Sequence, residues 1–233
     1  HDEADETKPF TPLSAPNYQH VVDIDTVIQP QPSIHIHKQN NTTLITHKPE
    51  FSWAGASAKA VGIAVHAALQ RVAEVGFELW TERHQQQVTT MMKAVLLDEG
   101  ISLAHLDKAL RRCVFGLNQC LKHSAKAQWL LSNQHQACHN EWALTYVDEG
   151  ICKHIVLDRS FIDEQGTRWV VDYKTGGHAG EGLDAFLDQE LIRYTQETPQ
   201  LPNYVKALKA LEPEREIKAA LYFPMVDGWR VWL

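Results

Sequence analysis

The stretch TRWVVDYKTGG, residues 167–177, constrains the fold more than any other part of the sequence. A short apolar run rich in β-branched and aromatic residues, which stops at two glycines, predicts a buried strand. Side chains two positions apart in a strand point to the same face, so Asp172 and Lys174 share one face and Tyr173 points to the other. The strand therefore brings an acid and a base together on one face of a sheet that is otherwise apolar.

The loop before this strand fixes its register with the strand that precedes it. A three-residue hairpin loop typically ends in a residue with a left-handed backbone, which glycine adopts best, and Gly166 stands at that position. Asp163 then pairs with Thr167, and counting back places Asp158 directly opposite Asp172. Directly opposed Cβ atoms are about 4.5–5.5 Å apart. The turn therefore predicts two neighbouring carboxylates, with a lysine one step along.

Two interpretations of these carboxylates stay open on the residues alone. They could form a cluster of salt bridges with Lys174 and with Arg159, which follows Asp158. Alternatively, both acids could hold a divalent cation, because hard oxygen ligands suit Mg²⁺ or Mn²⁺. Such a metal lowers the pKa of bound water and stabilises charge during the hydrolysis of a phosphodiester. Lys174 could then orient or deprotonate the attacking water, or offset the charge of the phosphate.

Two helical segments carry further polar residues. The segment VGIAVHAALQ places His66 about one turn after Gly62, where the missing side chain lets another backbone approach closely. His66 is equally a candidate for a histidine of the core. Further along, Gln200 and Tyr204 stand four positions apart, so one helix face would carry an amide and a phenol. Both groups can hydrogen-bond a phosphate or a base.

The pattern along the chain predicts helices first and strands second, which indicates an α/β or α+β sheet with helices packed on it. Residues 1–54 are acidic, polar and contain several prolines, so they predict a linker or an extended arm. His35, His37 and His47 in this arm are interpreted as part of a solvated segment rather than as a metal site. The expected helices are 57 to 76 or 80, 85–99, 102–120, 125–133 and 183–211. The expected strands are 141–148, 153–163, 167–175, 217–226 and 229–233.

Composition argues against several classes of protein. The net charge of −7 does not suit a free-standing protein that grips nucleic acid by bulk charge, although a partner could deliver the substrate. The sequence has no apolar run of membrane-spanning length and no signal-peptide pattern. The four cysteines form no CxxC pair, so we interpret them as buried free thiols in a reducing cytoplasm. Because the chain begins with His1, we expect a fragment of something longer or a processed chain.

Four pieces of the sequence, taken in order, resemble a known family. They are G-x-x-x-H on a helix, an Asp in LDR, the run VVDYKTG, and Q-x-x-x-Y on a helix. Together they resemble the RecB-like nuclease domain of the PD-(D/E)XK superfamily, over about residues 55–233. The resemblance implies an α/β, restriction-endonuclease-like core, in which helices flank a mixed central β-sheet and a helical insertion separates the first helix from the sheet. In that family the domain is often the C-terminal part of a UvrD/Rep-type helicase–nuclease, as in RecBCD and AddAB.

The resemblance also implies a role for each motif residue. Lys174 would be the catalytic lysine, acting with Asp158 and Asp172. Gln200 and Tyr204 would position the DNA near the scissile phosphate. The implied ligands of Mg²⁺ or Mn²⁺ are His66, Asp158, Asp172 and, as a further ligand, the backbone carbonyl of Tyr173.

The sequence departs from the family pattern at several positions. Ile155 stands where the family usually has a glycine, three residues before the motif Asp. Glu141 could match a Glu-rich strand of the family, but the sequence assigns it no role. Pro202 lies between the amide and the phenol of the last motif and is tolerated only in the first helical turn, so that helix begins near Pro199 or later.

The function that the resemblance implies is a metal-dependent DNA exonuclease or endonuclease that acts in recombination and double-strand-break repair. Its partners would be DNA, as single-stranded ends, and a fused or bound helicase that supplies the basic track. Its location would be the bacterial cytoplasm, at the nucleoid. Two other functions stay open: a non-catalytic structural or DNA-binding module that kept the motif residues, and a different metal hydrolase or a plain scaffold with surface ion pairs.

Overall fold

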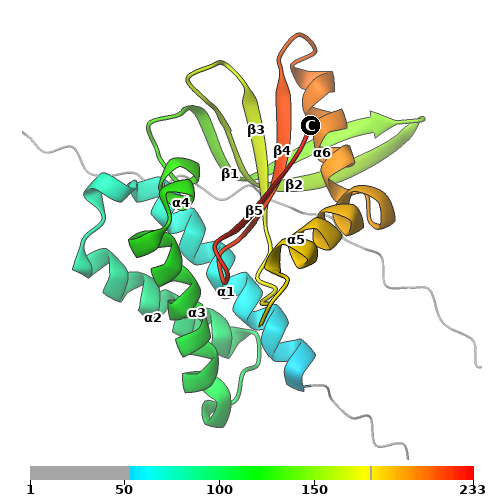
Figure 1. Ribbon diagram of the computed structural model, residues 1–233. Coiled ribbons are helices and arrows are strands. Elements are labelled where there is room, and N and C mark those ends of the chain that lie inside the picture. The colour runs from blue at the N-terminus through cyan, green and yellow to red at the C-terminus, as the bar shows by residue number, and fades with distance from the viewer. Residues whose placement is uncertain (1–52, 179) are drawn as a thin grey trace, which may run out of the picture. The chain divides into compact units, whose positions relative to one another are not determined.

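Helices come first and strands second in the part of the chain that the computed structural model describes, residues 53–178 and 180–233 (Figure 1). These residues belong to one compact unit, Pro49–Leu233. The arm predicted over residues 1–54 lies outside the described residues except for its last two positions, which already belong to the first helix. His35, His37 and His47 lie outside them as well, so the arm and its boundary stay predictions.

In the described part of the chain, four α-helices and a short 3-10 helix (Phe77–Leu79) precede the sheet, at nearly the predicted positions. The first ends because Gly76 adopts a left-handed φ of +83° and the side chain of Asn133 packs where a Cβ would stand. The second begins at a capping box, in which Thr81 and His84 exchange hydrogen bonds. These helices are α1 (Trp53–Val75), α2 (Glu82–Asp98), α3 (Leu103–His123) and α4 (Ala125–Leu130).

The sheet has five strands in the order β1–β2–β3–β4–β5. β3 and β4 run parallel, and the other neighbours are antiparallel, so the sheet is mixed as the resemblance implied. The helices α2, α3 and α4 form the expected insertion between the first helix and the sheet. The strands are β1 (Gln136–Asp148), β2 (Ile151–Ile162), β3 (Arg168–Tyr173), β4 (Ile217–Phe223) and β5 (Gly228–Trp232).

The turn between β2 and β3 confirms the predicted register. The N–H of Asp163 donates to the carbonyl of Thr167 at 3.0 Å, and Gly166 has the left-handed φ of +85° that the loop requires. The ladder that follows pairs Arg159 with Val171. One step further along the same register places Asp158 opposite Asp172.

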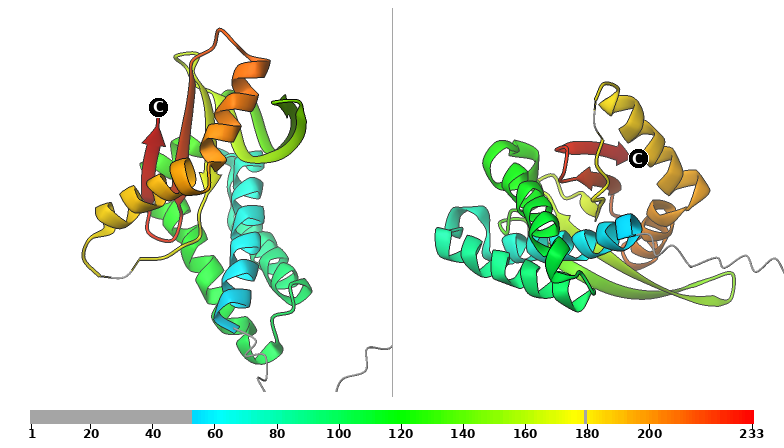
Figure 2. Two further views of the ribbon diagram at one scale, coloured as in Figure 1. Left: turned by 90° about the vertical axis from the view of Figure 1, so that its right-hand side faces the viewer. Right: turned by 90° about the horizontal axis from the view of Figure 1, so that it is seen from below.

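Helices cover both faces of the sheet (Figures 1 and 2). Alternate residues of β4 belong to different cores, because successive side chains in a strand point to opposite faces. Ala220 and Tyr222 pack with α1, α3 and α4, whereas Leu221 and Phe223 pack with the helices that follow β3. The sheet that carries Asp158 and Asp172 is therefore flanked by two apolar layers.

The single helix predicted over residues 183–211 is wrong. The structure has α5 (Leu183–Ile192), a π-helical turn (Arg193–Glu197) and a separate helix α6 (Gln200–Leu211). Thr198 has a ψ of +83°, outside the helical region, because the residue before a proline is disfavoured there. Pro199 then caps α6, and Pro202 falls in its first turn, as predicted.

The cysteines are free, as expected, but their burial was predicted only in part. Cys113 and Cys120 are buried in the core. Cys138 is half-buried, and Cys152 is exposed near the turn between β1 and β2, so the prediction of buried thiols is wrong for these two. Among the helices described, none is both long and apolar enough to cross a membrane.

Candidate active site

The site begins where β2 and β3 separate. Their ladder ends at Arg159 and Val171, and one residue further the carboxylate of Asp158 accepts a hydrogen bond from the N–H of Tyr173 at 2.7 Å. The side chain of Asp158, rather than a backbone carbonyl of β2, thus accepts the hydrogen bond from the N–H of Tyr173. β3 meanwhile stays paired with β4, where Asp172 lies opposite Leu221. The two acids therefore lie where the sheet opens.

Asp172 is buried, at 2% exposure, and its two oxygens have different surroundings. Oδ1 accepts hydrogen bonds from Nε2 of Gln200 at 2.7 Å and from the hydroxyl of Tyr204 at 3.2 Å. Oδ2 forms an ion pair with Nζ of Lys174 at 2.6 Å and accepts no hydrogen bond from the described residues. The charged neighbour of this buried oxygen is therefore Lys174.

His66 reaches the acids from α1. Its Nδ1 lies 3.5 Å from Oδ2 of Asp158, and its Nε2 lies 2.9 Å from the backbone carbonyl of Tyr173. Because a carbonyl only accepts, the ring proton is assigned to Nε2, which leaves the lone pair of Nδ1 facing Asp158. The close approach predicted at Gly62 is made by the hydroxyl of Thr175, 3.1 Å from where a Cβ would stand, and not by a backbone.

Burial lowers the pKa of His66, although the charge of Asp172 opposes this effect. The ring is therefore neutral at physiological pH and offers a lone pair to a ligand. Its side chain is 28% exposed and makes polar contacts, unlike a histidine of the apolar core.

Glu141 completes a group that sequence reasoning left without a role. One ligand atom from each of His66, Glu141 and Asp158 fits within a span of 4.8 Å. Glu141 has a left-handed φ of +46° inside β1, a strand that also shifts register between Gln136 and His139. Such irregularities re-aim side chains next to active sites, and a non-glycine residue in this conformation leaves no signal in the sequence.

The three carboxyl groups repel one another. Burial, followed by the charge of Asp172, raises the pKa of Asp158 to about 8, and Glu141 contributes in the same direction. Burial and Asp172 also raise the pKa of Glu141. The carboxylates of Glu141 and Asp158 with the imidazole of His66, beside Asp172, are a donor set that suits a hard divalent cation. The residues present therefore fit such an ion.

Gln200 connects the acid to the lysine. Its Oε1 accepts from Nζ of Lys174 at 2.9 Å, while its Nε2 donates to Asp172 and to the hydroxyl of Tyr204. The predicted amide and phenol thus share one face at the start of α6, and both polar groups contact Asp172. The position of Pro202 in the first turn does not disturb this pair.

The salt bridge between Asp158 and Arg159, one part of the alternative explanation, does not form. Arg159 is fully buried and donates to the carbonyls of Leu130 and Ser132 and to the side chain of Asn140. Its guanidinium thereby satisfies carbonyls at the end of α4. The ion pair between Asp172 and Lys174 does form, on the shared face that the strand predicts.

Comparison with known proteins places this geometry in a family. A family model described as the PD-(D/E)XK nuclease superfamily matches residues 46–229, a range that contains every motif residue and the whole described sheet except the end of β5. A comparison with curated proteins gives no match. The mixed sheet, the helices on both of its faces and the acids with an adjacent lysine agree with the family match. The chain therefore belongs to the PD-(D/E)XK nuclease superfamily.

Proposed function

We propose that this chain is a Mg²⁺- or Mn²⁺-dependent deoxyribonuclease domain, of the RecB-like kind, that hydrolyses phosphodiester bonds. The observation that supports this most is the buried Asp172, whose Oδ2 accepts no hydrogen bond from the described residues and lies 2.6 Å from Nζ of Lys174. Asp158, His66 and Glu141 lie beside it. Acids, an imidazole and an ammonium in one place match the demands of phosphodiester hydrolysis.

The metal would be held by carboxylates from three strands and by one imidazole. His66 would ligate through Nδ1, since its Nε2 already donates to the carbonyl of Tyr173. That carbonyl has a second lone pair and would be a further ligand. When bound, the metal would lower the pKa of a water molecule and stabilise negative charge on the phosphate. The proposed ligands are His66, Glu141, Asp158 and Asp172.

The residues around the acids set their orientation and supply positive charge. Gln200 and Tyr204 fix Oδ1 of Asp172, so its Oδ2 is the oxygen left for a cation. Lys174 would place its ammonium at the scissile phosphate, where it orients the attacking water or offsets charge. Gln200 and Tyr204 would also position the DNA near the scissile phosphate.

The wider role is part of the same proposal. The net charge of −7 suits a domain to which a fused or bound helicase delivers single-stranded ends, because such a partner supplies the basic track. We assign the domain to residues 55–233 and its work to recombination and double-strand-break repair, in the bacterial cytoplasm at the nucleoid.

Cleavage of end-labelled DNA tests the proposal. The purified chain, with Mn²⁺ or Mg²⁺, should degrade single-stranded DNA, and Asp172→Ala should reduce cleavage to background. Calorimetric titration with Mn²⁺ should show binding that weakens in Asp158→Ala and in Glu141→Gln, while Glu164→Gln, at the exposed β2–β3 turn, serves as the matched control. Metal binding without cleavage would favour a non-catalytic module. Absence of metal binding would favour a scaffold with ion pairs.

A further inference from the structure

An aromatic ring lies against the lysine of the proposed site. Nζ of Lys174 lies 3.8 Å from the centroid of the Tyr194 ring. Cation–π attraction acts within about 6 Å of a ring centroid, so this is a close contact. Tyr194 belongs to neither the strand motif nor the pair on α6, and sequence reasoning gave it no role. The contact therefore needs an explanation of its own.

Three partners surround the ammonium, and they come from three segments. Oδ2 of Asp172 lies 2.6 Å away on β3, Oε1 of Gln200 accepts at 2.9 Å from α6, and the ring of Tyr194 belongs to the π-helical turn. The lysine side chain is only 17% exposed. Fixing a lysine side chain in one conformation costs rotamer entropy, so the contacts with these three partners must offset that cost.

The proposed function, on which this inference rests, divides these partners into two kinds. Oδ2 of Asp172 is also the oxygen left for a divalent cation, so a bound cation would compete with Lys174 for it. Neither Gln200 nor Tyr194 is a proposed metal ligand. Both are uncharged, so they hold the ammonium without adding negative charge where an anionic phosphate must approach.

The backbone that carries Tyr194 is itself unusual. The N–H of Thr198 donates to the carbonyl of Arg193, five residues back, at 2.7 Å, which closes a π-helical turn between α5 and α6. The hydroxyl of Thr195 donates to the carbonyl of Leu191 at 2.6 Å. π-helical turns are rare and are frequent at functional sites. The turn places Tyr194 half-buried against the core that lies beneath α6.

We propose that Tyr194 is a positioning residue for the proposed reaction: its ring face holds the ammonium of Lys174 at the place where the scissile phosphate binds. It acts through the lysine and does not touch the substrate. The ring face is the part that matters, and the hydroxyl is not required.

Kinetics separate this role from DNA binding and from folding. Tyr194→Phe keeps the ring face and should leave kcat within about twofold, whereas Tyr194→Leu should lower kcat by about tenfold with KM unchanged. Tyr146→Leu is the matched control, because Tyr146 is a buried tyrosine on β1 whose hydroxyl has no hydrogen-bond partner among the described residues. It should lose stability and keep kcat. All variants are compared at a temperature at which each is folded by circular dichroism.

A spectroscopic measurement on the metal-free protein tests the contact without any cleavage. With lysine labelled at ¹³Cε, the Lys174 resonance, assigned by its absence in Lys174→Arg, should show an upfield ring-current shift. The shift should persist in Tyr194→Phe and disappear in Tyr194→Leu. If the wild-type protein lacks the shift, the inference is wrong whether or not the protein cleaves DNA.

The kinetic outcomes that overturn the inference are equally specific. Equal kcat values for Tyr194→Leu and wild type would show that the ring does not position the lysine. A raised KM with unchanged kcat would make Tyr194 a DNA contact instead. If the protein binds no metal and cleaves nothing, the proposed function fails and this inference fails with it; cleavage with equal kcat values leaves the proposed function intact and removes only the inference.

Discussion

At the scale of single residues, Asp172 shows how one carboxylate serves two kinds of partner. Neutral donors from α6 hold Oδ1, and the ammonium of Lys174 is the charged neighbour of Oδ2. The neutral donors fix the orientation without cancelling the charge. On the proposed function, a metal ion would compete with the ammonium for the oxygen that has the charged neighbour. This division leads to separate predictions for the lysine and for the histidine.

Lys174→Ala should abolish turnover while metal binding survives. Removal of the ammonium leaves Oδ2 of Asp172 without its cationic neighbour, so Mn²⁺ affinity should stay equal or rise. Cleavage should fall by at least about 100-fold, as when a preorganised charge is lost from an active site. Calorimetry and a cleavage assay on the same preparation measure both. Cleavage at the wild-type rate would contradict the role given to this lysine.

His66→Ala should weaken metal binding more than folding. The imidazole is 28% exposed and its Nδ1 faces Asp158, so its loss removes a donor without opening a core cavity. We expect Mn²⁺ affinity to fall at least about tenfold with a small change in Tm. The measurements are calorimetric titration and thermal unfolding in EDTA. A large fall in Tm at unchanged affinity would instead identify a histidine of the core.

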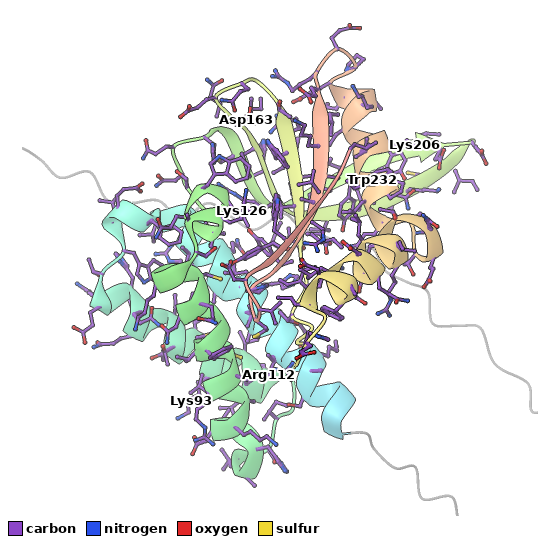
Figure 3. All side chains as sticks on the ribbon, in the orientation of Figure 1. Lys93, Arg112, Lys126, Asp163, Lys206 and Trp232 are labelled. Atoms are coloured by element: carbon purple, nitrogen blue, oxygen red, sulfur yellow. The ribbon has the colours of Figure 1, made fainter. Side chains whose placement is uncertain are left out.

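At the scale of elements, ion pairs fasten the separate pieces around the site. Asp148, near the end of β1, pairs with Lys153 on β2 at 2.6 Å and with Lys206 on α6, which Figure 3 shows beside the hairpin of β1 and β2. Arg168 at the start of β3 pairs with Glu212 at the end of α6 at 2.6 Å. The second pair links the two elements that carry Asp172 and Gln200.

The Arg168–Glu212 pair should make stability depend on pH. The hydrogen bond from Arg168 lowers the pKa of Glu212 below its usual 4.5, and Arg215 adds to this effect. A carboxylate with a lowered pKa stabilises the fold above its unfolded-state pKa, and the contribution disappears as pH falls through the folded-state value, below 4.5. Glu212→Gln should therefore cost about 1 kcal/mol at pH 7, and this cost should shrink as the pH falls below 4.5.

Urea unfolding of wild type and Glu212→Gln across this pH range provides the measurement. The difference between the two proteins isolates Glu212 from the other carboxylates that titrate in the same range. Glu164→Gln, which changes an exposed acid at the β2–β3 turn, is the matched control for the loss of one carboxylate. A constant difference between wild type and Glu212→Gln at every pH would exclude the ionic origin.

The sequence predicts strand register better than it predicts helix continuity. The glycine in the β2–β3 turn restricts the possible pairings, so counting from it finds where Asp158 and Asp172 meet. Helical periodicity continues across residues 193–199, because the apolar spacing does not register a π-helical turn or a proline break. Sequence reasoning assigned no role to Glu141 or Tyr194, because each is placed by a local backbone conformation that tertiary packing selects.

At the scale of the described unit, the site is assembled from both helical layers and from the sheet between them. α1 brings His66 from one side, α6 brings Gln200 and Tyr204 from the other, and the separating strands bring the acids. No short segment contains the site. Its formation is therefore coupled to the packing of the two cores, and a ligand that binds only the assembled site stabilises the whole unit.

The thiols report on the integrity of this unit. Burial raises the pKa of Cys113 to about 11 and that of Cys120 to about 12, whereas Cys152 is exposed. Because the thiolate is the reactive form, Cys152 should be alkylated first, Cys138 more slowly, and the two core thiols only after unfolding. Peptide mass spectrometry after timed alkylation gives the order. Guanidinium-unfolded protein, in which all four should react alike, is the control.

The ion pair between Asp172 and Lys174 also has a consequence for how the chain matures. A buried carboxylate that depended on an outside ion for charge balance would hinder folding until that ion arrived. Here the ammonium two residues along the same strand acts as an internal counterion. We therefore expect the polypeptide to complete its fold in a metal-poor environment. On the proposed function, the supply of divalent ions would control when the folded protein becomes competent rather than whether it folds.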